Sequence, residues 1–206
     1  NTGNAADTIV WYNSNNVVNG RIFSNLCTNL RCGATGEFFL TGYRAVYYNL
    51  KCEIEKSFNW KKGKALWLAN GSISNTQPSF WYEQWGSNNF EWHNSVVEKY
   101  KSLNKESRLI IGSTFSYPGR KTEIKINYAI INNFTDFDTT AHPSQYSGDL
   151  YVTALTISKG LKLWKFHLDN DIIIQKSNNS EVLSLPLATI RSAAYFEHLF
   201  NFKSTG

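Results

Sequence analysis

The sequence predicts an all-β protein, an antiparallel β-sandwich of the immunoglobulin-like or jelly-roll-like kind with one short helix. Three observations favour this class. Segments that alternate apolar and polar side chains recur along the 206 residues, turn-forming residues separate them, and aromatic residues make up 15% of the chain. Asn, Ser and Thr are also abundant, and they favour turns and pleated strands over helix interiors.

The expected strands follow from alternation and from the turn signals between them. Alternation is clearest at 122–131, where every second residue from Ile124 to Ile130 is apolar. Asn70-Gly71 predicts a hairpin, and Ser158-Lys159-Gly160 predicts another tight turn. About ten strands spaced by turns favour a sandwich or a closed sheet. The expected set is 8–12, 17–23, 37–48, 50–56, 64–69, 108–111, 122–131, 150–157, 161–167, 171–174 and 182–185.

One short segment carries a helix signal. Ser95-Val96-Val97-Glu98 has the Ser-x-x-Glu spacing of a capping box, in which the two side chains satisfy the first backbone amides of a helix. We therefore expect the short helix there. Segment 189–200 has weak helical spacing, and its state stays open.

The length fits one domain over residues 1–206, which can bury a sizeable core without a metal. No apolar run approaches the roughly 20 residues of a membrane-spanning helix, so we expect no membrane insertion. The chain starts at Asn1 and contains no Met, as a mature secreted form without its leader would.

The net charge of +5 is too mild and too dispersed to favour a nucleic-acid partner. The densest basic cluster surrounds Gly63 and predicts a solvated hairpin turn. Its alternative is a contact surface for an anionic partner, such as a sialylated or sulphated glycan. The cluster consists of Lys56, Lys61, Lys62 and Lys64.

Three cysteines lie close together in the sequence, which suggests one disulfide and one remaining thiol. Cys52 shares the face of an alternating segment with Leu50 and Ile54 and should point inward. We favour a Cys32–Cys52 disulfide, with Cys27–Cys52 as the next choice. Three reduced thiols are the remaining alternative, and the spacing fits no zinc site.

Motifs of common enzymes are absent: the chain has no GxSxG, HExxH, GxGxxG or phosphate-binding loop. We therefore expect no enzyme, no cofactor and no metal. Glu83 and Glu91 flank an aromatic segment and keep a carbohydrate-active enzyme open as an alternative, because glycosidases place two carboxylates among aromatic rings.

The most informative segment is 80–93, in which six of fourteen residues are aromatic and Gly86-Ser87-Asn88-Asn89 forms a turn signal. Aromatic rings beside amide and carboxylate groups suit a sugar, since rings cover its C–H face and polar groups meet its hydroxyls. The same mixture suits a protein hot spot, a membrane-interface belt or a plain core. The predicted ligand-binding residues are Trp81, Tyr82, Glu83, Trp85, Asn88, Asn89, Glu91, Trp92 and His93.

A segment later in the chain resembles a known family. The Pro143, Tyr146, Gly148 and Leu150 pattern, followed by the alternating 151–157, is similar to the opening of a late strand in bacterial chaperone–usher fimbrial subunits and tip adhesins. The usual Gly or Ala near Ser144 is lacking. The resemblance implies an N-terminal receptor-binding lectin domain that is exported through the periplasm to a fimbrial tip on the bacterial surface. A periplasmic chaperone and other fimbrial subunits would be its partners.

Together these observations predict a surface adhesin domain that binds host glycans on glycoproteins or glycolipids. Two alternatives stay open: a secreted toxin or pore-forming subunit that uses the same aromatic residues at a membrane, and the carbohydrate-active enzyme.

Overall fold

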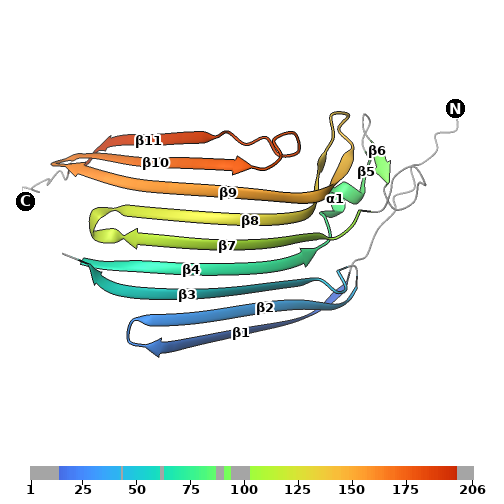
Figure 1. Cartoon of the computed structure of the whole chain (residues 1–206), viewed down its shortest axis with the longest axis horizontal. Helices are drawn as coiled ribbons and strands as arrows, with labels where there is room; N and C mark the ends of the chain where they lie inside the picture. The colour runs from blue at the N-terminus through green and yellow to red at the C-terminus, as the bar shows by residue number, and fades with distance from the viewer. Residues whose placement is uncertain (1–13, 43, 61–62, 87–90, 94–102, 199–206) are drawn as a thin grey trace, which may run out of the picture.

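The computed structural model describes residues 14–42, 44–60, 63–86, 91–93 and 103–198. Nine strands form one antiparallel sheet, in which each strand lies beside its neighbour along the chain (Figure 1). The connection between β4 and β7 holds a helical turn and a two-stranded ribbon. The elements are β1 (Asn15–Cys27), β2 (Leu30–Gly42), β3 (Tyr48–Trp60), β4 (Gly63–Thr76), α1 (Phe80–Glu83), β5 (Gln84–Gly86), β6 (Glu91–His93), β7 (Glu106–Tyr117), η1 (Pro118–Arg120), β8 (Thr122–Phe137), β9 (Pro143–Leu163), β10 (Phe166–Ser177) and β11 (Ala188–Phe196).

The predicted class is confirmed, since the protein is all-β and antiparallel with one short α-helix. The arrangement differs from two packed sheets: the nine long strands share one layer, and the only other pairing in the described part of the chain is the β5–β6 ribbon. The helix predicted at 95–98 lies outside the described residues, and the observed helix is α1.

The sheet is not closed. Among the described residues, β1 pairs only with β2 and β11 pairs only with β10, so each edge strand leaves one row of backbone groups without a described strand partner. The two edge strands run in the same direction, because an odd number of antiparallel strands separates the two edges.

The two ends of the sheet differ in their connections. At the end that we call the turn end, the strands are joined by residues 28–29, 61–62, 118–121 and 164–165. At the opposite end, the loop end, the connections are residues 43–47, 77–105, 138–142 and 178–187. The helical turn α1 lies at the loop end (Figure 1).

Very few apolar side chains are buried. Among the described residues the buried hydrophobic ones are Tyr47, Ala65, Leu103 and Leu150, whereas thirty large hydrophobic residues are exposed. A chain of this length ordinarily encloses a core. The described fold therefore leaves a large apolar surface in contact with whatever surrounds it.

The predicted disulfide is absent, because Cys32 and Cys52 are both free thiols. Cys32 lies opposite Ile54 and Cys52 lies opposite Ala34 across the β2–β3 pair. The two cysteines are thus diagonal neighbours about 7–8 Å apart, beyond the Cα spacing of ordinary disulfides. Cys52 does share a face with Leu50 and Ile54, as predicted, but it is exposed.

Several local signals were overridden by strand pairing. Asn70-Gly71 lies inside β4, where Gly71 pairs with Cys52 and with Ile111, and the predicted hairpin there was wrong. β9 continues past 158–160 to Leu163, so that predicted turn was also wrong. Segment 189–200 contributes to strand β11, while 182–185 lies in a connection rather than a strand. In the described part of the chain, no helix has the length and apolar character needed to cross a membrane.

Candidate functional site: the two faces of the sheet

The register divides the side chains of the sheet into two sets. Residues directly opposite each other in an antiparallel pair project from the same face. Ile126 lies opposite Ser113 and Leu155, and this row continues to Ile174. The face that contains Ile126 is called the apolar face. It includes Leu50, Ile54, Ile73, Leu109, Ile111, Ile124, Ile126, Ile130, Leu155, Ile157, Ile172, Ile174 and Ile190.

The opposite face, called the polar face, carries most of the charged and amide side chains. Arg31 and Glu55 lie opposite each other there with a 3.6 Å ion pair, and Lys125 and Glu123 form another at 3.6 Å. Apolar residues occur on this face too, mainly toward the loop end, where Leu150 is buried. Its polar members include Asn49, Lys51, Glu53, Glu55, Asn70, Ser72, Thr114, Glu123, Lys125, Asn127, Thr156, Asp169 and Asp171.

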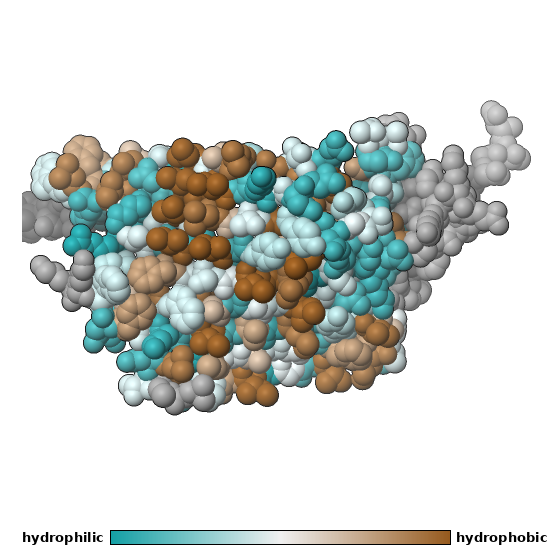
Figure 2. Space-filling view, in the orientation of Figure 1, coloured by the Kyte–Doolittle hydropathy of each residue, from teal (hydrophilic) through white to brown (hydrophobic). Residues whose placement is uncertain are grey.

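Exposure is inverted relative to a water-soluble sheet. Along β8, Ile124, Ile126 and Tyr128 are exposed while Lys125 and Asn127 between them are half-buried. Ile126 is 51% exposed. A soluble sheet that packs on a core shows the opposite pattern, with apolar residues inside and polar residues outside. Hydrophobic side chains gather over the middle of the sheet in Figure 2, and hydrophilic ones lie toward the loop end.

Aromatic residues border the apolar face near the turn end. Trp60 and Phe115 rings are 6.3 Å apart, and the Tyr117 hydroxyl donates to the Trp60 carbonyl over 3.0 Å. At the far side of the sheet, Phe166 and Phe196 lie with ring centroids 5.1 Å apart. Phe38, Tyr48 and Tyr151 occupy the same face nearer the loop end, and Tyr128 lies among the aliphatic residues, between Ile126 and Ile130. The aliphatic band therefore lies between two sets of rings.

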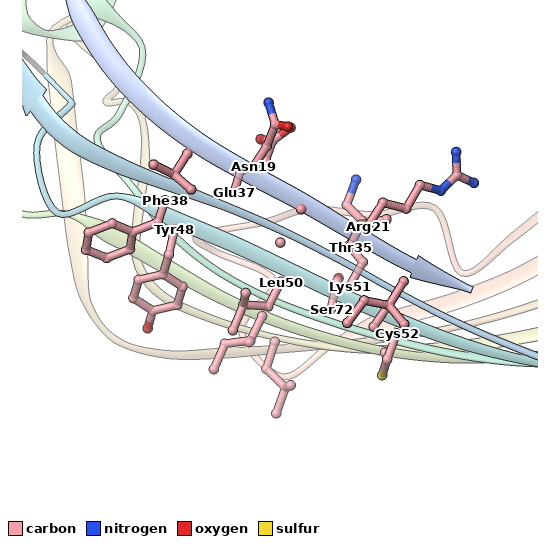
Figure 3. Close-up of a pocket in the computed structure, with 18 residues that line it drawn as sticks. Asn19, Arg21, Thr35, Glu37, Phe38, Tyr48, Leu50, Lys51, Cys52 and Ser72 are labelled. Carbon is pink, nitrogen blue, oxygen red and sulfur yellow. The ribbon is translucent and has the colours of Figure 1, made fainter. Parts of the chain in front are cut away.

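A groove of about 950 Å³ lies on the apolar face over β1 to β4. Gly20 lies opposite Gly36, and Gly71 lies two strands further along, so small residues make the depression. Figure 3 shows the separation of the two faces at this place: Phe38, Tyr48, Leu50 and Cys52 point to one side, and Asn19, Arg21, Glu37 and Lys51 point to the other.

Two amides converge on the polar face above Gly112. A Cβ atom at Gly112 would lie 2.7 Å from the Oδ1 atoms of both Asn70 and Asn127. Gly112 lies opposite Asn70 on one side and Asn127 on the other. The absence of a side chain at this buried glycine leaves the space that the two amides occupy.

A network of polar groups, of which Glu106 and Thr135 are buried, holds the connection that leads into β7. Glu106 is buried, pairs with Arg108, and accepts a hydrogen bond from the Thr135 backbone amide over 3.3 Å. Gln145 donates to the Asn104 carbonyl over 2.8 Å and accepts from the Asn104 amide over 2.8 Å. These bonds tie the start of β7 to β8 and β9.

The other end of the same connection is held by Gln77. Its amide donates to the Leu103 carbonyl and to Glu83, and its oxygen accepts from the Tyr47 hydroxyl over 3.0 Å. Burial, followed by the nearby Glu83 carboxylate, raises the pKa of Tyr47 from 10.0 to about 12. Burial also raises the pKa of Tyr82, with Asp136 adding to the effect.

The predicted aromatic site lies in this connection at the loop end. Trp81, Tyr82 and Glu83 belong to α1 and Trp85 belongs to β5. Trp81 and Trp85 are 58% and 39% exposed, with ring centroids 5.2 Å apart, so these two indoles are at the surface as expected. The other predicted residues are Asn88 and Asn89, which lie outside the described residues, and Glu91, Trp92 and His93, whose backbone forms β6.

The residues that sequence reasoning missed are those of the two sheet faces. The signal was present: alternation in strand after strand places apolar residues on one side only. An antiparallel sheet with an apolar face bordered by aromatic rings and a polar face behind it is typical of proteins that cross outer membranes with strands.

The comparison with known families agrees with this class. The chain matches the family model described as "Putative porin" over residues 3–204, almost its whole length, and it belongs to that family. No curated protein and no solved structure matches it.

Family membership corrects three sequence-based predictions. The resemblance to fimbrial tip adhesins was wrong, and so was the adhesin function with its host-glycan receptor. The family supports a location in the outer membrane or at the cell surface, as predicted. It does not support the predicted location at a fimbrial tip. The alternative of a pore-forming protein is the one that agrees with the family.

Proposed function

We propose that this chain forms part of the wall of a water-filled passage across a bacterial outer membrane. Its apolar face contacts lipid, and its polar face lines the passage. The inverted exposure of β8 carries the proposal, because an isoleucine such as Ile126 is stabilised in acyl chains, whereas Asn127 and Lys125 need water or polar partners. This proposal departs from the expectation of no membrane insertion.

Strand length supports the proposal. A strand that crosses a bilayer at a tilt of about 45° needs about 9–11 residues. All nine strands reach that length, from 9 residues in β11 to 21 in β9. Each strand from β2 to β10 in the nine-stranded sheet pairs with a neighbour on both sides, which satisfies most of the hydrogen-bonding demand of a hydrocarbon environment and leaves the outer rows of β1 and β11 to be met by other groups.

The connections support one orientation. Strands of outer-membrane proteins have short turns on the periplasmic side and longer loops outside. The turn end accordingly faces the periplasm, and α1 with the β5–β6 ribbon faces the exterior. The aromatic rings near both ends of the apolar face, such as Trp60 and Tyr151, then lie at the two levels where lipid headgroups begin.

The experiment compares neighbouring positions on β8. In a background with serine at positions 27, 32 and 52, Ile126→Cys and Asn127→Cys are each labelled with a small fluorophore, and the protein is reconstituted into vesicles. Lipids with brominated acyl chains should quench the label at 126 more strongly, and aqueous iodide should quench the label at 127 more strongly. Ile124→Cys and Lys125→Cys form a second pair with the same expectation.

Equal quenching by iodide at both positions would overturn the face assignment. Vesicles that hold the protein should also swell in an isosmotic solution of a small neutral sugar. Tight vesicles around correctly inserted protein would overturn the passage.

A further inference from the structure

The turn end of the sheet has an unusual charge composition. Its four connections, residues 28–29, 61–62, 118–121 and 164–165, contain five basic residues and no acidic one. The connections of the loop end contain four basic and five acidic residues, so the two ends differ in sign. The five basic residues of the turn end are Lys61, Lys62, Arg120, Lys121 and Lys165.

Hydrogen bonds join the basic turn at residues 118–121 to Lys159 and Gly160 of β9. Lys159 Nζ donates to the Arg120 carbonyl over 2.8 Å and to Thr122 Oγ1 over 2.7 Å. The Gly160 amide donates to the Lys121 carbonyl over 2.8 Å. The turn between β7 and β8 is thus hydrogen-bonded to β9, and the side chains of Arg120 and Lys121 are exposed at this turn.

The acidic residues nearest to this cluster have partners of their own. Glu123 pairs with Lys125 at 3.6 Å, and Asp169 accepts a hydrogen bond from the Tyr195 hydroxyl over 3.2 Å. Glu197 lies 3.0 Å from His167 Nε2. Only Glu123 is offset by a cation, whereas Asp169 and Glu197 keep a negative charge. The five basic residues of the connections outnumber these two, so the turn end stays net positive.

Exposed aromatic rings accompany the basic residues. Trp164 is 72% exposed, and Lys165 Nζ lies 4.9 Å from the centroid of its ring. The Trp164 ring also contacts Phe196, with centroids 6.4 Å apart. Indole rings settle at the headgroup level of a bilayer, and lysine side chains beside them extend their ammonium groups toward the headgroup phosphates.

We infer that the turn end docks on anionic phospholipid headgroups, with Arg120, Lys121 and Lys165 contacting the phosphates and Trp164 inserted beside them. This inference rests on the proposed function, because the headgroups meet the turn end only when the strands cross the bilayer. Positive residues near a membrane surface are attracted to anionic lipid, and salt weakens the attraction.

The experiment measures binding of the full chain to vesicles by flotation. One vesicle type is pure phosphatidylcholine, and the other contains one-third phosphatidylglycerol. We expect about tenfold tighter binding to the anionic vesicles at 50 mM salt, and a loss of most of that preference at 500 mM. The variant Arg120→Gln/Lys121→Gln/Lys165→Gln should lose most of the preference.

The matched control removes three positive charges from exposed positions toward the loop end, as Arg44→Gln/Lys51→Gln/Lys176→Gln. It should keep the preference. Equal loss in both variants, or no preference in the natural chain, would overturn the inference. Competition by millimolar inorganic phosphate would also overturn it, since the site would then bind free anion. Quenching at position 126 in neutral vesicles reports on the proposed function independently of these outcomes.

Discussion

Ile126 and Asn127 are consecutive residues of β8 that project from opposite faces of the sheet, and the isoleucine is the more exposed of the two. This order is the reverse of that in a soluble protein, where burial of the isoleucine would stabilise the fold. It becomes favourable when the medium around Ile126 is hydrocarbon. The two positions therefore offer the sharpest comparison of the two faces.

A lysine should be tolerated on one face and costly on the other. Ile126→Lys places a charge on the lipid side of β8, among the aliphatic residues of the apolar face, and should lower the free energy of unfolding in vesicles by about 2–4 kcal/mol. Asn127→Lys adds the same charge to the polar face and should change it by less than about 1 kcal/mol. Denaturant titration in vesicles, followed by tryptophan fluorescence, measures both. Equal costs would contradict the assignment of the faces.

The amides above Gly112 predict a steric effect. Gly112→Val should push aside Asn70 and Asn127, whose Oδ1 atoms lie 2.7 Å from the position of the new Cβ, and should destabilise the protein by about 1–3 kcal/mol. Gly20→Val is the control, because nothing lies within 4 Å of its Cβ position. Asn127→Ala should recover part of the loss when combined with Gly112→Val. Urea midpoints of the natural chain, Gly112→Val, Asn127→Ala, the double variant and Gly20→Val test this, and additive effects of Gly112→Val and Asn127→Ala would contradict it.

The strands could be predicted because alternation is a local property. The 122–131 segment gave both a strand and the division of its side chains between two faces, and β8 carries that division. What the alternation could not tell is the medium beside the apolar face. A second sheet and a lipid acyl chain present the same apolar surface to Ile124 or Ile126, and the sandwich was the more familiar choice.

Turns were harder to predict because pairing overrides local preference. Asn70-Gly71 has the strongest hairpin signal in the chain, yet both residues pair on two sides within β4. Ser158 and Lys159 likewise lie within β9. Ser158 pairs with Glu123 of β8 and Asp171 of β10, and Lys159 pairs with Thr122 and Asn170. Strands on both sides supply hydrogen bonds that outweigh the preference of these residues for a turn. The Gly112 site needed the register of three strands, which no local pattern gives.

The buried carboxylate of Glu106 predicts a stability effect at the loop end. Glu106→Ala leaves the Thr135 amide without its acceptor and Arg108 without its ion pair, and should cost about 1–3 kcal/mol. Glu123→Ala is the matched control, since its pair with Lys125 has both side chains 42% exposed and should contribute less than about 1 kcal/mol. Guanidinium unfolding in detergent micelles compares them. A smaller loss in Glu106→Ala than in Glu123→Ala would contradict the role of this network.

The alkaline titration of Tyr47 tests the packing of the connection between β4 and β7. Burial of the phenol, with the Glu83 carboxylate nearby, raises the pKa of Tyr47 to about 12. A raised pKa means that the folded state holds its proton more tightly than the unfolded chain, whose tyrosines titrate near 10. The stability gained from the neutral phenol is complete below pH 10 and is lost as the pH rises from 10 toward 12.

Absorbance at 295 nm between pH 9 and 13, with the spectrum of Tyr47→Phe subtracted, should show one step near pH 12 for this residue. Glu83→Gln should move the step to lower pH, because it removes the negative charge that disfavours the phenolate. The control is the same titration in a denaturant that unfolds the protein, where the step should return to about pH 10. A step near pH 10 in the folded protein would mean that the Tyr47 hydroxyl is solvated by water. The packing of Gln77 and Glu83 beside the Tyr47 hydroxyl would then be wrong.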